Sequence, residues 1–289
     1  MTSALALMRL ARPRQWAKNL LVLGAPLAAG QLSNTSVLLS SFVAFAVLLL
    51  ASIGTYILND IRDVELDRRH PKKKNRPFVA GEVSTAIAIG SCLFCTSTAL
   101  LISMICGNSE LFTLVCLYLV IQLLYQAGLK NIPLVEIVIV SSGFVIRAIA
   151  GGVAASLSLT PWFISVVASG SLFVVSAKRH SEHVSVGVSS GTRPVLEHYT
   201  KSYLQVLWVV ALTCSIIFYS MWAVGIGDSS GAKGVYSLLS AVPFSLMLLR
   251  YASYADRGLA ESPESLLFKD RLIQATALSW VALYWIYST

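Results

Sequence analysis

Four polar residues that could do chemistry lie close together after a long apolar segment: Asn59, Asp60, Asp63 and Asp67. On an α-helix, at about 100° per residue, Asp63 lies about 60° and Asp67 about 20° around the axis from Asp60. The three carboxylates are therefore predicted to form one stripe, which is costly unless a cation lies between them. Their oxygens suit Mg²⁺, which shares its coordination sphere with waters and substrate phosphates. We predict that the three aspartates bind the metal and, with Asn59, form the catalytic group.

Basic residues follow the aspartates at once: Lys72, Lys73, Lys74 and Arg76. Acidic and basic groups side by side are what a metal-bridged polyphosphate site needs. The metal neutralises some phosphate oxygens, and Lys and Arg neutralise the others. For Lys73 and Lys74, anchoring to anionic lipid head groups is an equally good explanation.

The segments that must position these residues are apolar. Hydrophobic residues make up 56% of the 289 residues and charged residues 12%, about half the charged share of a soluble domain. Charge-free runs cover residues 37–58, 83–106, 111–129, 161–177, 203–227 and 272–289, and weaker apolar segments cover 20–32, 137–159 and 235–249. The main runs approach or exceed the roughly 17–25 residues that span a bilayer as a helix. We predict an all-α, polytopic membrane bundle of about nine transmembrane helices, forming a single catalytic domain over residues 1–289.

The basic residues indicate the orientation of this bundle. All but two of the 22 Lys and Arg residues lie in the N-terminal stretch or near the loops after the second, fourth, sixth and eighth predicted spans. This bias predicts a cytoplasmic N-terminus and a cytoplasmic aspartate motif. The basic residues follow membrane topology and form no recognisable nucleic-acid motif, so nucleic-acid binding is not predicted. Only Arg147 lies within a span and no internal repeat is evident, which disfavours a transporter or channel.

The motif Asn59-Asp60-x-x-Asp63-x-x-x-Asp67, at the end of the second of nine predicted helices, resembles the first aspartate motif of the UbiA superfamily of membrane prenyltransferases. The longer string through His70-Pro71-x-Lys73-x-x-Arg76-Pro77 resembles the decaprenyl-phosphate phosphoribosyltransferase branch of that superfamily. Further matching segments begin at Arg12-Pro13, Tyr125, Ser141-Ser142, Lys178-Arg179 and Gly258-Leu259. The resemblance implies Mg²⁺-dependent transfer of the 5-phosphoribosyl group from phosphoribosyl pyrophosphate to polyprenyl (decaprenyl) phosphate. It also implies an actinobacterial plasma-membrane location and a role in making a cell-wall arabinan precursor.

One departure from the superfamily pattern bears on the substrate. Most relatives carry a second Asp-x-x-x-Asp motif after the sixth helix, where this chain has Lys178-Arg179-His180-Ser181-Glu182. Phosphoribosyl pyrophosphate and a lipid phosphate bring more anionic groups than a prenyl diphosphate and a neutral aromatic acceptor, so cations fit the phosphoribosyl branch. The alternative is a UbiA-type prenyltransferase that moves a prenyl group onto an aromatic acceptor. The predicted substrate-binding residues are Lys18, Arg62, Lys72, Lys74, Arg76, Tyr125, Lys130, Arg147, Lys178, Arg179 and Glu182.

Some of these residues have a second interpretation. Arg147 could pair structurally with Glu136 or a helix carbonyl, and Tyr125 could be an aromatic residue of the membrane interface. Glu182 could bind a second metal ion, although pairing with Lys178 one turn earlier is favoured. In the predicted reaction, the metal stabilises the leaving pyrophosphate while a lipid phosphate oxygen attacks the ribose anomeric carbon from the opposite face. An ionised phosphate needs no strong general base.

Overall fold

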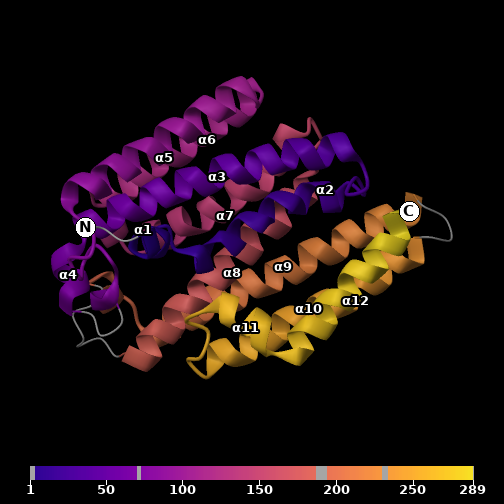
Figure 1. The fold of residues 1–289 in the computed structure, drawn as a ribbon. Helices are drawn as coiled ribbons and strands as arrows, with labels where there is room; N and C mark the ends of the chain where they lie inside the picture. Colours follow the sequence, from indigo (N-terminus) through magenta and orange to yellow (C-terminus); the bar gives the residue numbers. More distant parts are fainter. Residues whose placement is uncertain (1–3, 70–72, 187–193, 230–233, 289) are drawn as a thin grey trace. The chain divides into compact units, whose positions relative to one another are not determined.

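The computed structural model describes residues 4–69, 73–186, 194–229 and 234–288, and every regular element in these ranges is a helix (Figure 1). The α-helices are α1 (Ala4–Leu10), α2 (Gly24–Ala28), α3 (Thr35–Arg62), α4 (Val64–Arg69), α5 (Thr85–Ile105), α6 (Ser109–Ala127), α7 (Val135–Ala154), α8 (Pro161–Val186), α9 (Lys201–Ser229), α10 (Gly234–Asp256), α11 (Pro263–Lys269) and α12 (Arg271–Ser288). Short 3₁₀ helices are η1 (Pro13–Leu23), η2 (Lys73–Asn75), η3 (Leu129–Asn131) and η5 (Pro194–His198). The predicted all-α class is confirmed.

Seven helices in the described ranges are long and apolar enough to cross a membrane, namely α3 and α5 to α10. Many of their large apolar side chains are exposed, as in α5, where only 11% of the most apolar window is buried. Apolar surface on this scale requires a hydrocarbon environment rather than water. The protein is therefore a multi-pass membrane protein.

The first and last of the nine predicted spans are not among these seven helices. The last one coincides with α12, a helix of 18 residues whose first turn carries Arg271 and Gln274. The first one, at residues 20–32, is divided between η1 and α2. Proline lacks the amide that a continuous helix needs, so Pro26 is accommodated in the first turn of a new helix that begins at Gly24. Seven of the predicted membrane helices are thus long and apolar enough to span a bilayer in the described residues, and the count of about nine stays a prediction.

Contacts divide the chain into two compact units. The first contains residues 1–27, 31–132 and 146–158, and the second contains residues 28–30, 133–145 and 159–289. The predicted single catalytic domain stays a prediction.

In the first unit, α3 packs against α5, α6 and η1. The side chain of Asn34 caps the start of α3 by accepting a hydrogen bond from the amide of Ser36 at 3.1 Å. Gly54 lets α5 approach closely, because a Cβ there would lie 2.6 Å from the methyl group of Thr96. Helix α3 is therefore held along its length, and its C-terminal end carries the aspartate motif.

In the second unit, α9 packs against α8 and α10, and α10 also packs against α12. The core between α8, α9 and α10 is aromatic. The ring of Phe173 meets that of Tyr251 edge to face at 5.5 Å and lies 6.2 Å from that of Trp208. Offset and edge-to-face ring pairs add to the stabilisation from apolar burial.

The start of α12 is fixed by Asp270. This carboxylate accepts hydrogen bonds from the hydroxyl of Tyr254 at 2.6 Å, from Nη2 of Arg250 at 2.8 Å and from the amide of Ile273 at 2.8 Å. These donors hold the pKa of Asp270 well below its ordinary value, with the Tyr254 hydroxyl contributing most. Asp270 thus ties α10 to the beginning of α12.

Candidate active site

The aspartate motif spans the junction between α3 and α4. Asp60 lies in the last turn of α3, Asp63 follows the end of that helix, and Asp67 lies in α4. Helical hydrogen bonding continues through the junction, since the amide of Asp63 donates to the carbonyl of Asn59 at 2.9 Å and that of Asp67 to Asp63 at 2.8 Å. The carboxylates thus follow one another at one-turn intervals, but they divide between two groups of partners.

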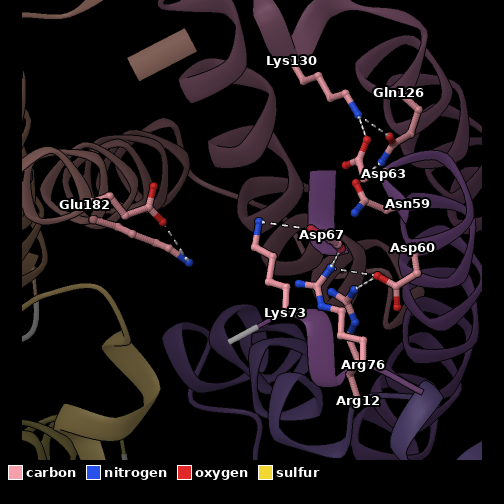
Figure 2. A network of polar contacts seen from close by, with 11 residues as sticks. Arg12, Asn59, Asp60, Asp63, Asp67, Lys73, Arg76, Gln126, Lys130 and Glu182 are labelled. Carbon is pink, nitrogen blue, oxygen red and sulfur yellow. Dashed lines mark hydrogen bonds and ion pairs between the residues drawn. The ribbon is translucent and has the colours of Figure 1, made fainter. Parts of the chain in front are cut away.

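One guanidinium nitrogen bridges the first and third carboxylates. Nη1 of Arg76 donates to Oδ1 of Asp60 at 2.9 Å and also to Oδ2 of Asp67. Arg12 donates to the same oxygen of Asp60, and Nζ of Lys73 lies 3.5 Å from Oδ1 of Asp67. Asp60 is 1% exposed and Asp67 3% exposed. Two buried carboxylates therefore converge on cations from separate parts of the chain (Figure 2).

Arg12 is a site residue that the sequence analysis did not select. Its backbone lies at φ 53° and ψ 63°, just before η1, in the left-handed region that arginine seldom adopts. The guanidinium carbon of Arg12 lies 5.1 Å from the centroid of the Tyr56 ring, within cation–π range. Burial lowers the pKa of Arg12, and the charge of Asp60 opposes that shift. The strained backbone and the aromatic ring together aim this side chain at Asp60.

The middle aspartate has its own partners. Nζ of Lys130, from η3, contacts Asp63 and lies 3.3 Å from Oε1 of Gln126. Nε2 of Gln126 donates to Oδ1 of Asn59 at 2.6 Å. The predicted residues Asn59, Asp63 and Lys130 thus meet in one hydrogen-bonded group, joined by Gln126, which the sequence analysis missed (Figure 2). A lone glutamine at the end of an apolar helix gave no signal of this role.

Other predicted substrate-binding residues of the first unit are placed less distinctively. Arg62 and Lys74 are exposed, whereas Lys18 and Tyr125 are partly buried. Lys72 lies outside the described residues. Lys73, for which lipid anchoring was an open alternative, contacts Asp67 instead of serving only as a surface charge.

Arg147 is a buried cation of the first unit. It is 5% exposed, and its Nε donates to Oδ1 of Asn19 at 2.8 Å while its Nη2 donates to Oγ of Ser52 at 2.6 Å. Nη2 also lies 3.2 Å from the hydroxyl of Tyr118, whose ring centroid is 5.2 Å from the guanidinium carbon. These contacts join η1, α3, α6 and α7, so Arg147 fixes α3 two turns before Asp60.

A second cluster of charges lies within the second unit. Nε and Nη2 of Arg179 donate to the two oxygens of Glu136 at 2.8 and 2.9 Å, and Nη1 donates to Glu182 at 2.9 Å. Glu136 and Arg179 are both buried, at 0% and 3% exposed. Nζ of Lys178 lies 3.9 Å from Glu182. The favoured pairing of Glu182 is therefore present, with Arg179 as its nearer partner, and substrate binding by Lys178, Arg179 and Glu182 stays a prediction.

The donors of the first cluster fit a hard divalent cation. No three His, Cys, Asp or Glu side chains among the described residues are gathered as a ready metal site. Carboxylate oxygens of Asp60 and Asp67 nevertheless meet at one point, which Nη1 of Arg76 marks. Mg²⁺ takes one or two carboxylates and completes its shell with waters and phosphate oxygens. Two oxygens that already share one cationic nitrogen could share such an ion.

The chain is similar over most of its length to proteins named decaprenyl-phosphate phosphoribosyltransferase. It is 42% identical over 277 residues to the decaprenyl-phosphate phosphoribosyltransferase of Mycobacterium tuberculosis (strain H37Rv), covering 94% of this chain and 90% of the relative. It is 38% identical to the Corynebacterium glutamicum enzyme of the same name, covering 93% of this chain and 82% of the relative.

Solved structures agree with the fold. A UbiA homolog from Archaeoglobus fulgidus bound to dimethylallyl diphosphate (DMAPP) and Mg²⁺ superimposes with a TM-score of 0.72 at 16% identity, covering 97% of this chain and 96% of that one. The same homolog bound to geranyl diphosphate (GPP) and Mg²⁺ gives 0.71 at 15% identity, covering 98% of each chain. The model of the UbiA prenyltransferase family matches residues 20–269, a range that includes both charge clusters except Arg12. With its all-helical fold and its aspartate motif at the end of α3, the chain belongs to the UbiA prenyltransferase family.

Proposed function

We propose that this protein transfers the 5-phosphoribosyl group from phosphoribosyl pyrophosphate to decaprenyl phosphate and releases pyrophosphate. The observation that carries the proposal is the similarity, over more than nine tenths of the chain, to enzymes named for this transfer. The cations around the aspartate motif agree with it, because both substrates are rich in phosphate.

The donor is proposed to bind at the cluster around Asp60. We propose that Asp60, Asp63 and Asp67 hold Mg²⁺, which would draw charge from the pyrophosphate leaving group. Around them, Arg76 and Lys130 supply positive charge where that group must accumulate negative charge.

The acceptor needs no base from the protein, because the lipid phosphate is already ionised near neutral pH. One of its oxygens forms a bond to the anomeric carbon of the ribose as the bond from that carbon to pyrophosphate breaks. Pyrophosphate leaves with the electron pair, so charge and atoms balance without a proton transfer. We propose that Lys178 binds an anionic substrate group, because it lies at the position where most relatives carry a second acidic motif. Arg179 is proposed to orient that segment through its bonds to Glu136 and Glu182.

The proposed location is the plasma membrane, with the N-terminus and the aspartate motif facing the cytoplasm. Its support is the distribution of Lys and Arg, which the positive-inside rule connects to the cytoplasmic side. Phosphoribosyl pyrophosphate is a soluble, highly charged molecule that would reach the site from that side.

A transfer assay tests the proposal. Purified protein in detergent would receive radiolabelled phosphoribosyl pyrophosphate, decaprenyl phosphate and Mg²⁺, and label in the lipid fraction would be counted. Asp60→Asn and Asp67→Asn are expected to lower the rate by at least about a hundredfold. The control is Glu65→Gln, because Glu65 is exposed and pairs with nearby Arg68.

The same protein would be offered a prenyl diphosphate and an aromatic acid. Prenyl transfer to the aromatic acid, with no label entering decaprenyl phosphate, would replace the proposed function by the alternative.

A further inference from the structure

The charges around the aspartate motif are nearly balanced within the protein itself. Each of the three carboxylates contacts at least one cationic side chain. The members of this cluster are Asp60, Asp63, Asp67, Arg12, Lys73, Arg76 and Lys130. Because four cations accompany three carboxylates, the cluster carries a formal charge of +1. A divalent ion added alone would raise that charge to +3 in a partly buried place, which is unfavourable.

Arg76 contacts the carboxylate oxygens that a metal ion would bind. Its Nη1 contacts Oδ1 of Asp60 and Oδ2 of Asp67 together, so an ion that bound both oxygens would have to take its place. Arg76 is the less confined of the two arginines: it follows the short helix η2, whereas Arg12 is stacked on Tyr56. A guanidinium binds carboxylate and phosphate with the same planar arrangement of donors.

We propose that Arg76 is an exchange residue: it holds Asp60 and Asp67 until a divalent metal arrives with a pyrophosphate group, and then moves onto the pyrophosphate oxygens. Arg12 stays on Asp60 throughout. Metal and pyrophosphate must then bind cooperatively, because the anion both receives Arg76 and offsets the added charge. The identity of the anion as pyrophosphate rests on the proposed function.

The proposed exchange predicts that removing the Arg76 guanidinium has opposite effects on the binding of metal and of pyrophosphate. Removing the guanidinium in Arg76→Met frees the two carboxylates for a metal ion but removes a phosphate donor. The variant is therefore expected to bind metal alone more tightly than the unaltered protein and to gain less from added pyrophosphate. If the metal bound elsewhere in the protein, removing Arg76 would give no such gain, because the two freed carboxylates would not be metal ligands.

Binding of Mn²⁺ to the purified full-length protein in detergent tests this inference. Free Mn²⁺ would be measured by electron paramagnetic resonance, with and without inorganic pyrophosphate, after correction for Mn²⁺–pyrophosphate binding in the buffer. For the unaltered protein, pyrophosphate is expected to strengthen Mn²⁺ binding by about tenfold or more, within the usual range of coupling between two ligands. For Arg76→Met, Mn²⁺ alone is expected to bind several-fold more tightly, and the strengthening by pyrophosphate is expected to fall below about threefold.

Arg68→Met is the matched control, because Arg68 belongs to the same segment, is exposed and pairs with Glu65 at 2.7 Å. Arg68→Met should bind Mn²⁺ like the unaltered protein, with and without pyrophosphate. The Mn²⁺ affinity of Arg76→Lys should lie between those of the unaltered protein and Arg76→Met. If Arg76→Met unfolds, Arg76→Lys alone decides, since equal Mn²⁺ affinity in Arg76→Lys and the unaltered protein would overturn the inference. Tight Mn²⁺ binding by the unaltered protein without pyrophosphate would also overturn the inference.

This readout is separate from transfer. Cooperative binding with no transfer to decaprenyl phosphate would contradict the proposed function and leave the exchange standing. Transfer without cooperative binding would contradict the exchange and leave the proposed function standing.

Discussion

The buried pair of Arg179 and Glu136 allows a quantitative prediction about stability. Glu136 is 0% exposed and receives two hydrogen bonds from Arg179, at 2.8 and 2.9 Å. Arg179→Met would leave this carboxylate buried without either bond. Removing one partner of a buried ion pair costs about 3–5 kcal/mol, because a buried charge is left uncompensated. We expect a value in that range, since no part of Glu136 is open to water.

The double variant Arg179→Met with Glu136→Leu is expected to recover most of that loss. Replacing both partners by apolar side chains removes the uncompensated charge, and such replacements are often neutral or stabilising. Lys178→Met is the matched control on the same helix. Its ammonium group lies 3.9 Å from Glu182 on a partly exposed side chain, so its loss should cost about 1 kcal/mol or less.

Unfolding of the purified variants in mild detergent, followed by circular dichroism against denaturant, gives these free energies. The reasoning would be refuted if Arg179→Met were no less stable than Lys178→Met. It would also be refuted if the double variant were less stable than Arg179→Met, because the cost would then not arise from the buried charge of Glu136.

Four further predictions concern the stability of single variants. Gly151→Ala should cost about 1–3 kcal/mol or more, since its Cβ would lie 1.7 Å from the carbonyl oxygen of Val22. Gly90→Ala, in α5 with open space around it, should be neutral or stabilising by about 0.5–1 kcal/mol. Arg147→Met should cost about 1–3 kcal/mol by leaving buried acceptors without their donor. Asp270→Asn should lower the melting temperature at pH 7, with a difference that shrinks below about pH 4, because a depressed pKa contributes stability only above the unfolded value.

Much of the fold follows from the pattern of apolar residues. A charge-free run of the right length must be a helix in hydrocarbon, so the spans that became α3, α5, α6, α8 and α9 could be read directly, whereas α7 and α10 correspond to weaker apolar segments. The segment at residues 20–32 could not, because Pro26 divides it and its environment decides where one helix ends and the next begins.

The candidate site was predictable in part. Helical spacing placed Asp60, Asp63 and Asp67 one turn apart, as the hydrogen bonds across the junction bear out. The sequence did not predict that Asp63 has different partners from Asp60 and Asp67. Arg12 lies 48 positions before Asp60 in the chain, and only tertiary packing and a left-handed backbone bring them together. Gln126 likewise reaches Asn59 only because α6 packs against α3.

The most direct test of the central claim follows two labels in one reaction. Phosphoribosyl pyrophosphate would carry ¹⁴C in the ribose and ³²P in the β-phosphate, and the protein would be supplied with decaprenyl phosphate and Mg²⁺. The proposed reaction breaks the bond between the anomeric carbon and pyrophosphate, so ¹⁴C should enter the lipid fraction while ³²P appears in the water phase as pyrophosphate, in equal amounts. If ³²P entered the lipid, or if ¹⁴C stayed in the water phase, phosphoribosyl transfer would be contradicted.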